Sequence, residues 1–148
     1  MKVLANDGIS KSGVKKLEKA GFEVLTTKVA QEQVANYINA NNIDVLLVRS
    51  ATKAKEDIID NCPNLKIIGR GGFGMDNIAV DYARSKGIHV INTPASSSES
   101  VAELVFAHLF AGVRFLHDAN RNMPLEGDTN FNGLKKAYAE GLELRGKT

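Results

Sequence analysis

Cysteine is almost absent from the chain, and charge of either sign is close to balance. The one cysteine, Cys62, cannot form an internal disulfide, and metal sites built on paired cysteines are excluded, which indicates a reducing compartment. The 19 basic and 17 acidic residues leave a formal net charge of +2. That charge is too small to favour nucleic acid or an anionic membrane as a partner, so an anion site would have to be local.

A long uninterrupted apolar run is also missing. Residues 1–10 hold three consecutive apolar residues before Asn6, so no signal peptide is expected. The most apolar segment, residues 102–116, contains Glu103 and Arg114 and falls short of a membrane span. These features predict a cytoplasmic protein that has neither a membrane segment nor a membrane partner.

The chain does contain a regular alternation of short apolar runs and helical patterns. The apolar runs cover residues 2–5, 22–25, 44–48, 66–69 and 89–92. The helical patterns between them end near glycine or asparagine, as the C-termini of helices prefer. A strand–helix repeat of this length predicts parallel strands joined by right-handed crossovers. We therefore expect an α/β fold with a flavodoxin-like, doubly wound parallel sheet of five strands, formed by residues 1–98.

The pattern changes after residue 98. Two capping-box matches, Ser96 with Glu99 and Ser100 with Glu103, predict the start of a long junction helix over residues 99–119. This helix is apolar on most of its surface, so it should be buried by more than one neighbour, and without them we expect oligomers or aggregation.

The remainder of the chain is polar and interrupted by glycine. One short helix is expected around residues 134–140, within an otherwise irregular tail. Residues 99–148 are therefore interpreted as a junction helix and a lead-in segment rather than as a second complete domain.

Ligands of open parallel sheets bind beyond the carboxyl ends of the strands. The third, fourth and fifth apolar runs end in one group of polar residues and glycines: Arg49, Ser50, Arg70, Gly71, Gly72, Asn92 and Thr93. Two arginines, a hydroxyl and a series of backbone N–H groups suit a carboxylate or a phosphate. Because the loops at the opposite edge offer no such group, the sequence predicts an anion site at this edge.

Several kinds of site are not supported by the sequence. The glycines at 69, 71, 72 and 74 do not give the G-x-G-x-x-G dinucleotide fingerprint. The three histidines have no obvious acidic partner in the sequence, and Asp7, Asp76 and Asp81 lie in different loops. We therefore assign no catalytic residue and no metal ligand.

Four segments in order, RSAT (49–52), GRGGFGMDNI (69–78), GIHVINTP (87–94) and SVAEL (100–104), closely resemble the NAD-dependent D-2-hydroxyacid dehydrogenases. The resemblance extends over essentially the whole chain. It implies a flavodoxin-like substrate domain, joined by long helices to an inserted Rossmann domain that binds NAD. The last residues, ELRGKT, are similar to the segment that leads into that missing domain.

The resemblance also implies roles for particular residues. Those expected to bind substrate are Arg49, Ser50, Arg70, Gly71, Gly72, Asn92, Ser97 and Lys136. In this set the glycines and neighbouring amides hold the substrate carboxylate, and Lys136 or Lys135 corresponds to a lysine that reaches across a dimer. Phe73 is expected to lie next to the nicotinamide of NAD.

The family's reaction is a hydride transfer, and its histidine, acid and arginine come from motifs downstream of the cofactor fingerprint. The chain alone is therefore expected to be inactive. The resemblance implies a homodimer and a small phosphorylated hydroxy acid as substrate, 3-phospho-D-glycerate, which is oxidised in serine biosynthesis. Two alternatives stay open: another D-2-hydroxyacid dehydrogenase, such as a glycerate or hydroxypyruvate reductase, and a non-catalytic anion-binding module.

Overall fold

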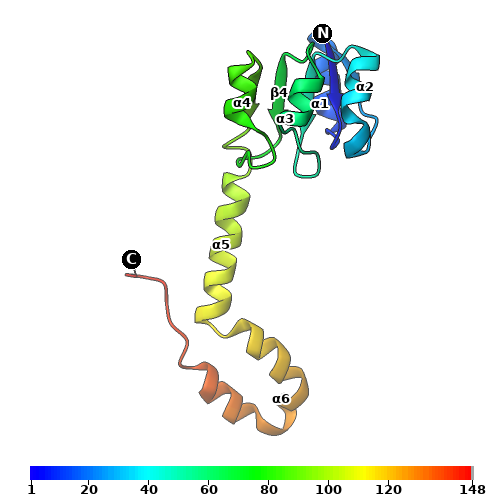
Figure 1. Cartoon of the computed structure of the whole chain (residues 1–148). Coiled ribbons are helices and arrows are strands. Elements are labelled where there is room, and N and C mark those ends of the chain that lie inside the picture. Colours follow the sequence, from blue (N-terminus) through cyan, green and yellow to red (C-terminus); the bar gives the residue numbers. More distant parts are fainter. Residues whose placement is uncertain (148) are drawn as a thin grey trace. The chain divides into compact units, whose positions relative to one another are not determined.

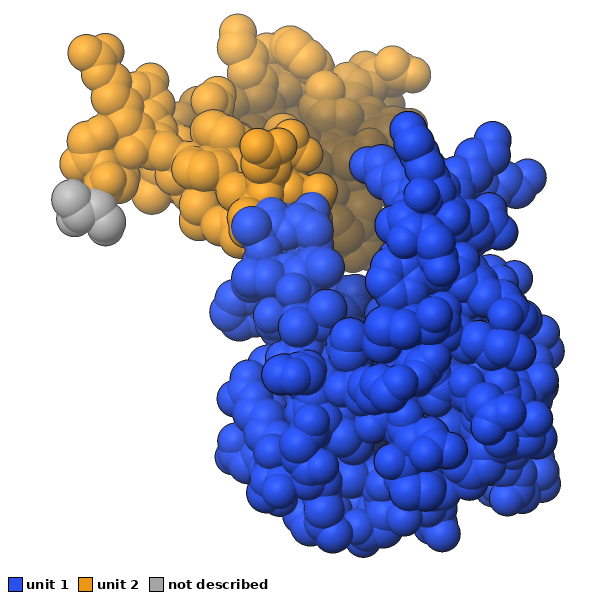
Figure 2. Space-filling view, turned by 90° about the horizontal axis from the view of Figure 1, so that it is seen from above, with its two compact units in different colours: residues 1–97 blue, residues 98–148 orange. Residues whose placement is uncertain are grey.

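The computed structural model describes residues 1–147, and the chain divides into two compact units (Figures 1 and 2). The first unit is Met1–Ser97, and the second begins at Ser98. The last residue of the expected lead-in segment, Thr148, lies outside the described residues.

The first unit is built on a parallel sheet of five strands. The strands are β1 (Lys2–Ala5), β2 (Glu23–Leu25), β3 (Val45–Val48), β4 (Ile67–Arg70) and β5 (His89–Asn92), arranged in the order β2-β1-β3-β4-β5. This is the strand order of flavodoxin-like sheets. The α/β fold and the five strands expected from the sequence are therefore confirmed.

Four helices connect the strands, as the alternating pattern predicts. They are α1 (Lys11–Lys19), α2 (Val34–Asn41), α3 (Glu56–Asn61) and α4 (Val80–Ser85), and a short 3-10 helix, η1 (Gln31–Gln33), precedes α2. Local sequence explains two of the boundaries. The Ser10 hydroxyl accepts a hydrogen bond from the Gly13 N–H at the start of α1. Asn42 ends α2 in the left-handed conformation, which asparagine tolerates better than most residues.

One face of the sheet carries the hydrophobic core. Leu4, Leu46, Ile68 and Val90 lie in buried positions on this face, and the core also includes residues of α2, α3 and α4. Fully burying one aliphatic side chain of this size contributes roughly 1.5–3 kcal/mol. Burial of these four side chains thus stabilises the packing of the helices on the sheet.

The opposite face is less completely covered at the carboxyl ends of the strands. Leu47, Gly69 and Ile91 are paired across β3, β4 and β5 and so share this face. Ile91 is 57% exposed, in contrast to the buried Val90 next to it. An apolar surface therefore remains open where the sheet meets the predicted anion site.

The single cysteine is part of the core. Cys62 is fully buried at the end of α3, and burial raises the pKa of its thiol to about 11. Because the thiolate is the reactive species, we expect Cys62 in the folded protein to react with a thiol reagent at pH 8 far more slowly than in urea. Equal rates under the two conditions would contradict its burial.

The second unit consists of two helices, α5 (Ser98–Val113) and α6 (Leu116–Tyr138). The predicted junction helix ends at Val113, before a turn in which Phe115 has a positive φ of 53°. Helix α6 is much longer than the short helix expected in this region, although it contains Pro124 and bends at Asn130. Residues 141–144 have no regular secondary structure.

Contacts between the two ends of α6 explain why it is longer than expected. Asn122 donates a hydrogen bond of 2.9 Å to the Tyr138 hydroxyl, and the rings of Phe115 and Tyr138 lie 6.3 Å apart. The end of α6 therefore packs against its own beginning. Such contacts override the weak helix propensity of a segment with proline and glycine.

Helix α5 exposes its apolar side chains. Val101, Leu104, Val105, Phe106, Leu109 and Phe110 are each between 43% and 58% exposed. The neighbours expected to bury this helix are thus not supplied by residues 1–147. No single helix among these residues is long and apolar enough to cross a membrane, and only α5 and α6 taken together, bent by 52°, reach the required length and hydropathy.

Candidate functional site

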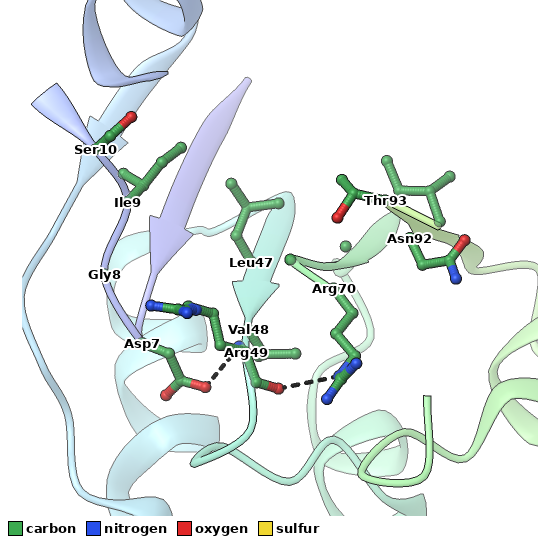
Figure 3. Close-up of a pocket in the computed structure, with 13 residues that line it drawn as sticks. Asp7, Gly8, Ile9, Ser10, Leu47, Val48, Arg49, Arg70, Asn92 and Thr93 are labelled. Atoms are coloured by element: carbon green, nitrogen blue, oxygen red, sulfur yellow. Dashed lines mark hydrogen bonds between the residues drawn. The ribbon is translucent and has the colours of Figure 1, made fainter. Parts of the chain in front are cut away.

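The carboxyl ends of β3, β4 and β5 meet in a cleft of about 590 Å³ (Figure 3). Strand register brings the ends together, because Val48 pairs with Arg70 and Arg70 pairs with Asn92. The cleft is lined on its polar side by Asp7, Arg49, Arg70, Gly71, Asn92 and Thr93. Leu47, Ile9 and Ile91 form its apolar side.

The two arginines have different surroundings. In Figure 3 the Arg49 side chain extends toward the Asp7–Gly8 segment, while Arg70 turns toward the backbone of Arg49. The Arg70 Nε donates to the Arg49 carbonyl oxygen at 3.3 Å. Arg49 therefore has its guanidinium available to a ligand, whereas Arg70 also supports the loop that carries Arg49.

The glycine loop after β4 is fastened to the end of β5. The Gly72 N–H donates to the Thr93 hydroxyl at 2.9 Å, and the Thr93 N–H donates back to the Gly72 carbonyl. Asn92 donates to the Phe73 carbonyl at 2.7 Å. These bonds fix the loop against the cleft.

The same bonds decide which N–H groups are free for an anion. The Gly71 N–H already donates to the Val48 carbonyl, and that of Gly72 to Thr93. By contrast, the N–H groups of Phe73 and Gly74 donate to no acceptor in residues 1–147. A ligand carboxylate would therefore meet the neighbouring amides of the loop more readily than those of the two glycines.

Ser50 lines a second cleft of about 390 Å³, which adjoins the first. Arg49, Asp7 and Gly8 line both clefts, and Lys28 and Thr26 line only the second. Lys28 is not among the ligand-binding residues expected from the sequence. Its position just after β2, at the same edge of the sheet, was the signal that could have identified it.

The remaining predicted residues lie outside these two clefts. Phe73 is 71% exposed at the tip of the glycine loop, and Ser97 is an exposed residue at the end of the first unit. Gly72 does not line either cleft itself, although it holds the loop in place. Lys136 belongs to the last turn of α6 in the second unit.

Asp7 holds the loop that carries Arg49 and Ser50. One carboxylate oxygen accepts hydrogen bonds from the N–H groups of Arg49 (2.6 Å), Ala51 (3.2 Å) and Thr52 (3.0 Å). The other oxygen accepts from the Thr52 hydroxyl. Burial alone raises the pKa of Asp7, but these hydrogen bonds outweigh it and leave the pKa below its ordinary value.

The lowered pKa of Asp7 predicts a dependence of stability on pH. Ionised Asp7 stabilises the fold above the ordinary aspartate pKa of about 3.9, and this contribution is lost as the pH falls below that value. We expect Asp7→Asn to lose less unfolding free energy than the parent between pH 7 and pH 3. Urea denaturation at pH 7 and pH 3 measures the free energy of unfolding of both proteins. Equal losses in the two proteins would contradict the hydrogen bonds to ionised Asp7.

The glycine loop after β4 does not form a pyrophosphate site for NAD. Such a site needs a glycine turn that leads directly from a strand into a helix N-terminus. Here residues 71–79 separate β4 from α4. Residues 1–147 also contain no group of three or more histidine, cysteine, aspartate and glutamate side chains placed to hold a metal ion.

Comparison with known proteins identifies the class. Residues 3–137 match the family described as D-isomer specific 2-hydroxyacid dehydrogenase, catalytic domain. The chain therefore belongs to this family of dehydrogenases, and the family assignment made from the sequence is confirmed.

Two curated relatives are similar over nearly the whole chain. D-3-phosphoglycerate dehydrogenase of Methanocaldococcus jannaschii is 38% identical over 148 residues, which are 100% of this chain and 27% of that protein. Hydroxypyruvate reductase of Thermotoga maritima is 40% identical over 99% of this chain and 46% of its own length. The chain thus spans between about a quarter and a half of these relatives.

Solved structures agree with the fold. The PH0520 protein of Pyrococcus horikoshii has a TM-score of 0.81 and 23% identity, over 99% of this chain and 43% of that one. An NAD-bound 3-phosphoglycerate dehydrogenase of Entamoeba histolytica has a TM-score of 0.64 and 34% identity, over 77% of this chain and 39% of that one. NAD, the cofactor expected from the sequence, is bound in this second relative.

Proposed function

We propose that the chain is the substrate-binding part of a D-3-phosphoglycerate dehydrogenase, which oxidises 3-phospho-D-glycerate to 3-phosphohydroxypyruvate with NAD in serine biosynthesis. The main observation in support is the pair of adjoining clefts that share Arg49. The substrate carries two anionic groups, a carboxylate and a phosphate, on one short carbon chain. Two neighbouring clefts that share one arginine and carry further basic side chains suit such a molecule.

In this proposal the carboxylate lies in the first cleft, against Arg49 and Arg70, which both line it. The phosphate lies toward Lys28 and Ser50 in the second cleft. Both groups of the substrate then bind at once, and the reacting carbon between them is held in one orientation. Arg70 contributes positive charge, Asn92 lies at the border of the first cleft, and Phe73 faces the nicotinamide.

NAD supplies the hydride acceptor when it is bound. We propose that residues outside 1–147 hold its pyrophosphate, because the glycine loop after β4 forms no site for it. The chain by itself then binds substrate without turning it over. A second copy would cover the exposed apolar side chains of α5, and in the resulting cytoplasmic homodimer Lys136 would assist phosphate binding.

A Lys28 variant tests the phosphate assignment. We expect Lys28→Gln to weaken the binding of 3-phospho-D-glycerate about tenfold and to leave the binding of D-glycerate nearly unchanged, because the lost charge faces only the phosphate. Isothermal titration calorimetry of both ligands measures the difference. Lys66→Gln, at the amino end of β4 beside Asp44, is the matched control.

The same titrations separate the alternatives. Equal affinity of the parent chain for D-glycerate and 3-phospho-D-glycerate would favour a hydroxypyruvate reductase, as in the Thermotoga maritima relative. Binding of inorganic phosphate as tight as that of 3-phospho-D-glycerate would favour a simple anion-binding module. A strong preference for 3-phospho-D-glycerate supports the proposal.

A further inference from the structure

The segment Arg49–Thr52 has no regular secondary structure, yet it carries both Arg49 and Ser50. A loop of this kind keeps its side chains in a fixed direction only if its backbone groups are held by the rest of the fold. The groups that hold this segment therefore determine the direction in which the Arg49 side chain points.

Three of the four backbone N–H groups of this segment donate to one carboxylate. Asp7, from the loop after β1, accepts the N–H groups of Arg49, Ala51 and Thr52 through one oxygen and the Thr52 hydroxyl through the other. No neutral side chain of this size offers two acceptor oxygens to four donors.

The carbonyl groups of the segment are held from the other side. The Asn77 side-chain nitrogen donates to the Arg49 carbonyl at 2.8 Å and to the Thr52 carbonyl at 2.7 Å. Arg70 adds a second donor to the Arg49 carbonyl. The segment is therefore fixed between a carboxylate that binds its N–H groups and an amide that binds its carbonyls.

We propose that Asp7 is a positioning residue for the anion site, acting through the 49–52 segment to direct Arg49 and Ser50 toward the ligand. This inference rests on the proposed function, because it concerns binding of the same substrate. Asp7 lines both clefts, and its negative charge by itself repels an anionic ligand. Its presence in an anion site is explained by the loop that it holds.

The charge of Asp7 and its positioning role predict opposite changes in ligand affinity when Asp7 is substituted. If Asp7 acted only through its charge, Asp7→Asn would strengthen anion binding by removing a repulsion. If it acts through position, Asp7→Asn weakens binding. The asparagine keeps one acceptor oxygen, and its NH₂ group faces backbone N–H donors that it cannot bind.

The test measures affinity for 3-phospho-D-glycerate by calorimetry on the whole chain, with folding checked by circular dichroism. We expect Asp7→Asn to weaken binding about tenfold, and Asp7→Glu, which restores a carboxylate, to bind more tightly than Asp7→Asn. Asn77→Ala removes the other anchor and should weaken binding as well, and this variant decides the matter if Asp7→Asn does not fold.

Asp44→Asn is the matched control. Asp44 also accepts a backbone N–H, from Lys2, and its carboxylate pairs with Lys66, but it lies at the amino-terminal edge of the sheet. We expect this variant to lose stability without losing affinity. An equal loss of affinity in Asp44→Asn would assign the Asp7 effect to general destabilisation and overturn the inference.

The outcomes separate this inference from the function on which it rests. If the parent chain binds no 3-phospho-D-glycerate, the proposed function fails and the inference fails with it. If the parent binds and Asp7→Asn binds equally or more tightly, only the positioning role of Asp7 is overturned.

Discussion

Replacing Arg49 by alanine is expected to weaken binding of 3-phospho-D-glycerate by roughly 10- to 100-fold, the largest effect of any single side chain in the site. Arg49 is the basic residue shared by both clefts, so its loss affects the carboxylate and the phosphate together. Hydrogen bonds to charged groups contribute about 1.5–3 kcal/mol each, which corresponds to that range of affinity. Isothermal titration calorimetry at low and moderate salt measures the loss.

Arg84→Ala provides the control for the Arg49 prediction. Arg84 lies in α4 and lines a separate hollow beside the beginning of β5, together with Gly87 and His89. Its removal lowers the net charge of the chain by the same amount without touching either cleft. Unchanged affinity in Arg49→Ala, or an equal loss in Arg84→Ala, would mean that the ligand does not bind at the shared arginine.

The second large effect is expected on stability, from Gly72→Ala. Gly72 has a φ of +154°, a conformation that residues with a side chain rarely adopt, and a Cβ added there would lie 2.7 Å from the Arg70 guanidinium. Strain of this kind costs on the order of 1–3 kcal/mol. We expect the free energy of unfolding to fall by this amount and ligand affinity to fall as well, because Arg70 and the loop must move.

Gly71→Ala is the matched control for Gly72. A Cβ at Gly71 would meet the Arg49 side chain at 3.6 Å, an ordinary contact, and its φ is not positive. Urea denaturation should therefore show a change within about 0.5 kcal/mol. Equal destabilisation by the two substitutions would contradict the loop conformation described here.

The sequence predicts the architecture well because the fold follows from local periodicity. The five strands lie within one residue of the expected apolar runs, and the four connecting helices end near a glycine or an asparagine, as expected. Arg70 and Asn92 end neighbouring strands, so the pairing of β4 with β5 is enough to place them side by side. The edge of the sheet that holds the two clefts was predictable for the same reason.

The sequence does not predict how the site is held together. The role of Asp7 depends on bonds to residues more than 40 positions away, and a lone aspartate after a strand gives no sign of them. The occupied N–H groups of Gly71 and Gly72 depend equally on Val48 and Thr93. Helix α6 was underestimated because its contacts, such as Asn122 with Tyr138, are tertiary.

The most direct test of the account is a titration of the ¹⁵N-labelled chain with 3-phospho-D-glycerate, followed by nuclear magnetic resonance. The account predicts saturable shifts of the backbone amides in three loops: 49–52, 71–74 and 92–93. It also predicts a shift at Lys28, and none in residues 84–90 at the other edge of the sheet. Shifts confined to residues 84–90, or no saturable shift anywhere, would contradict an anion site at the carboxyl ends of the strands.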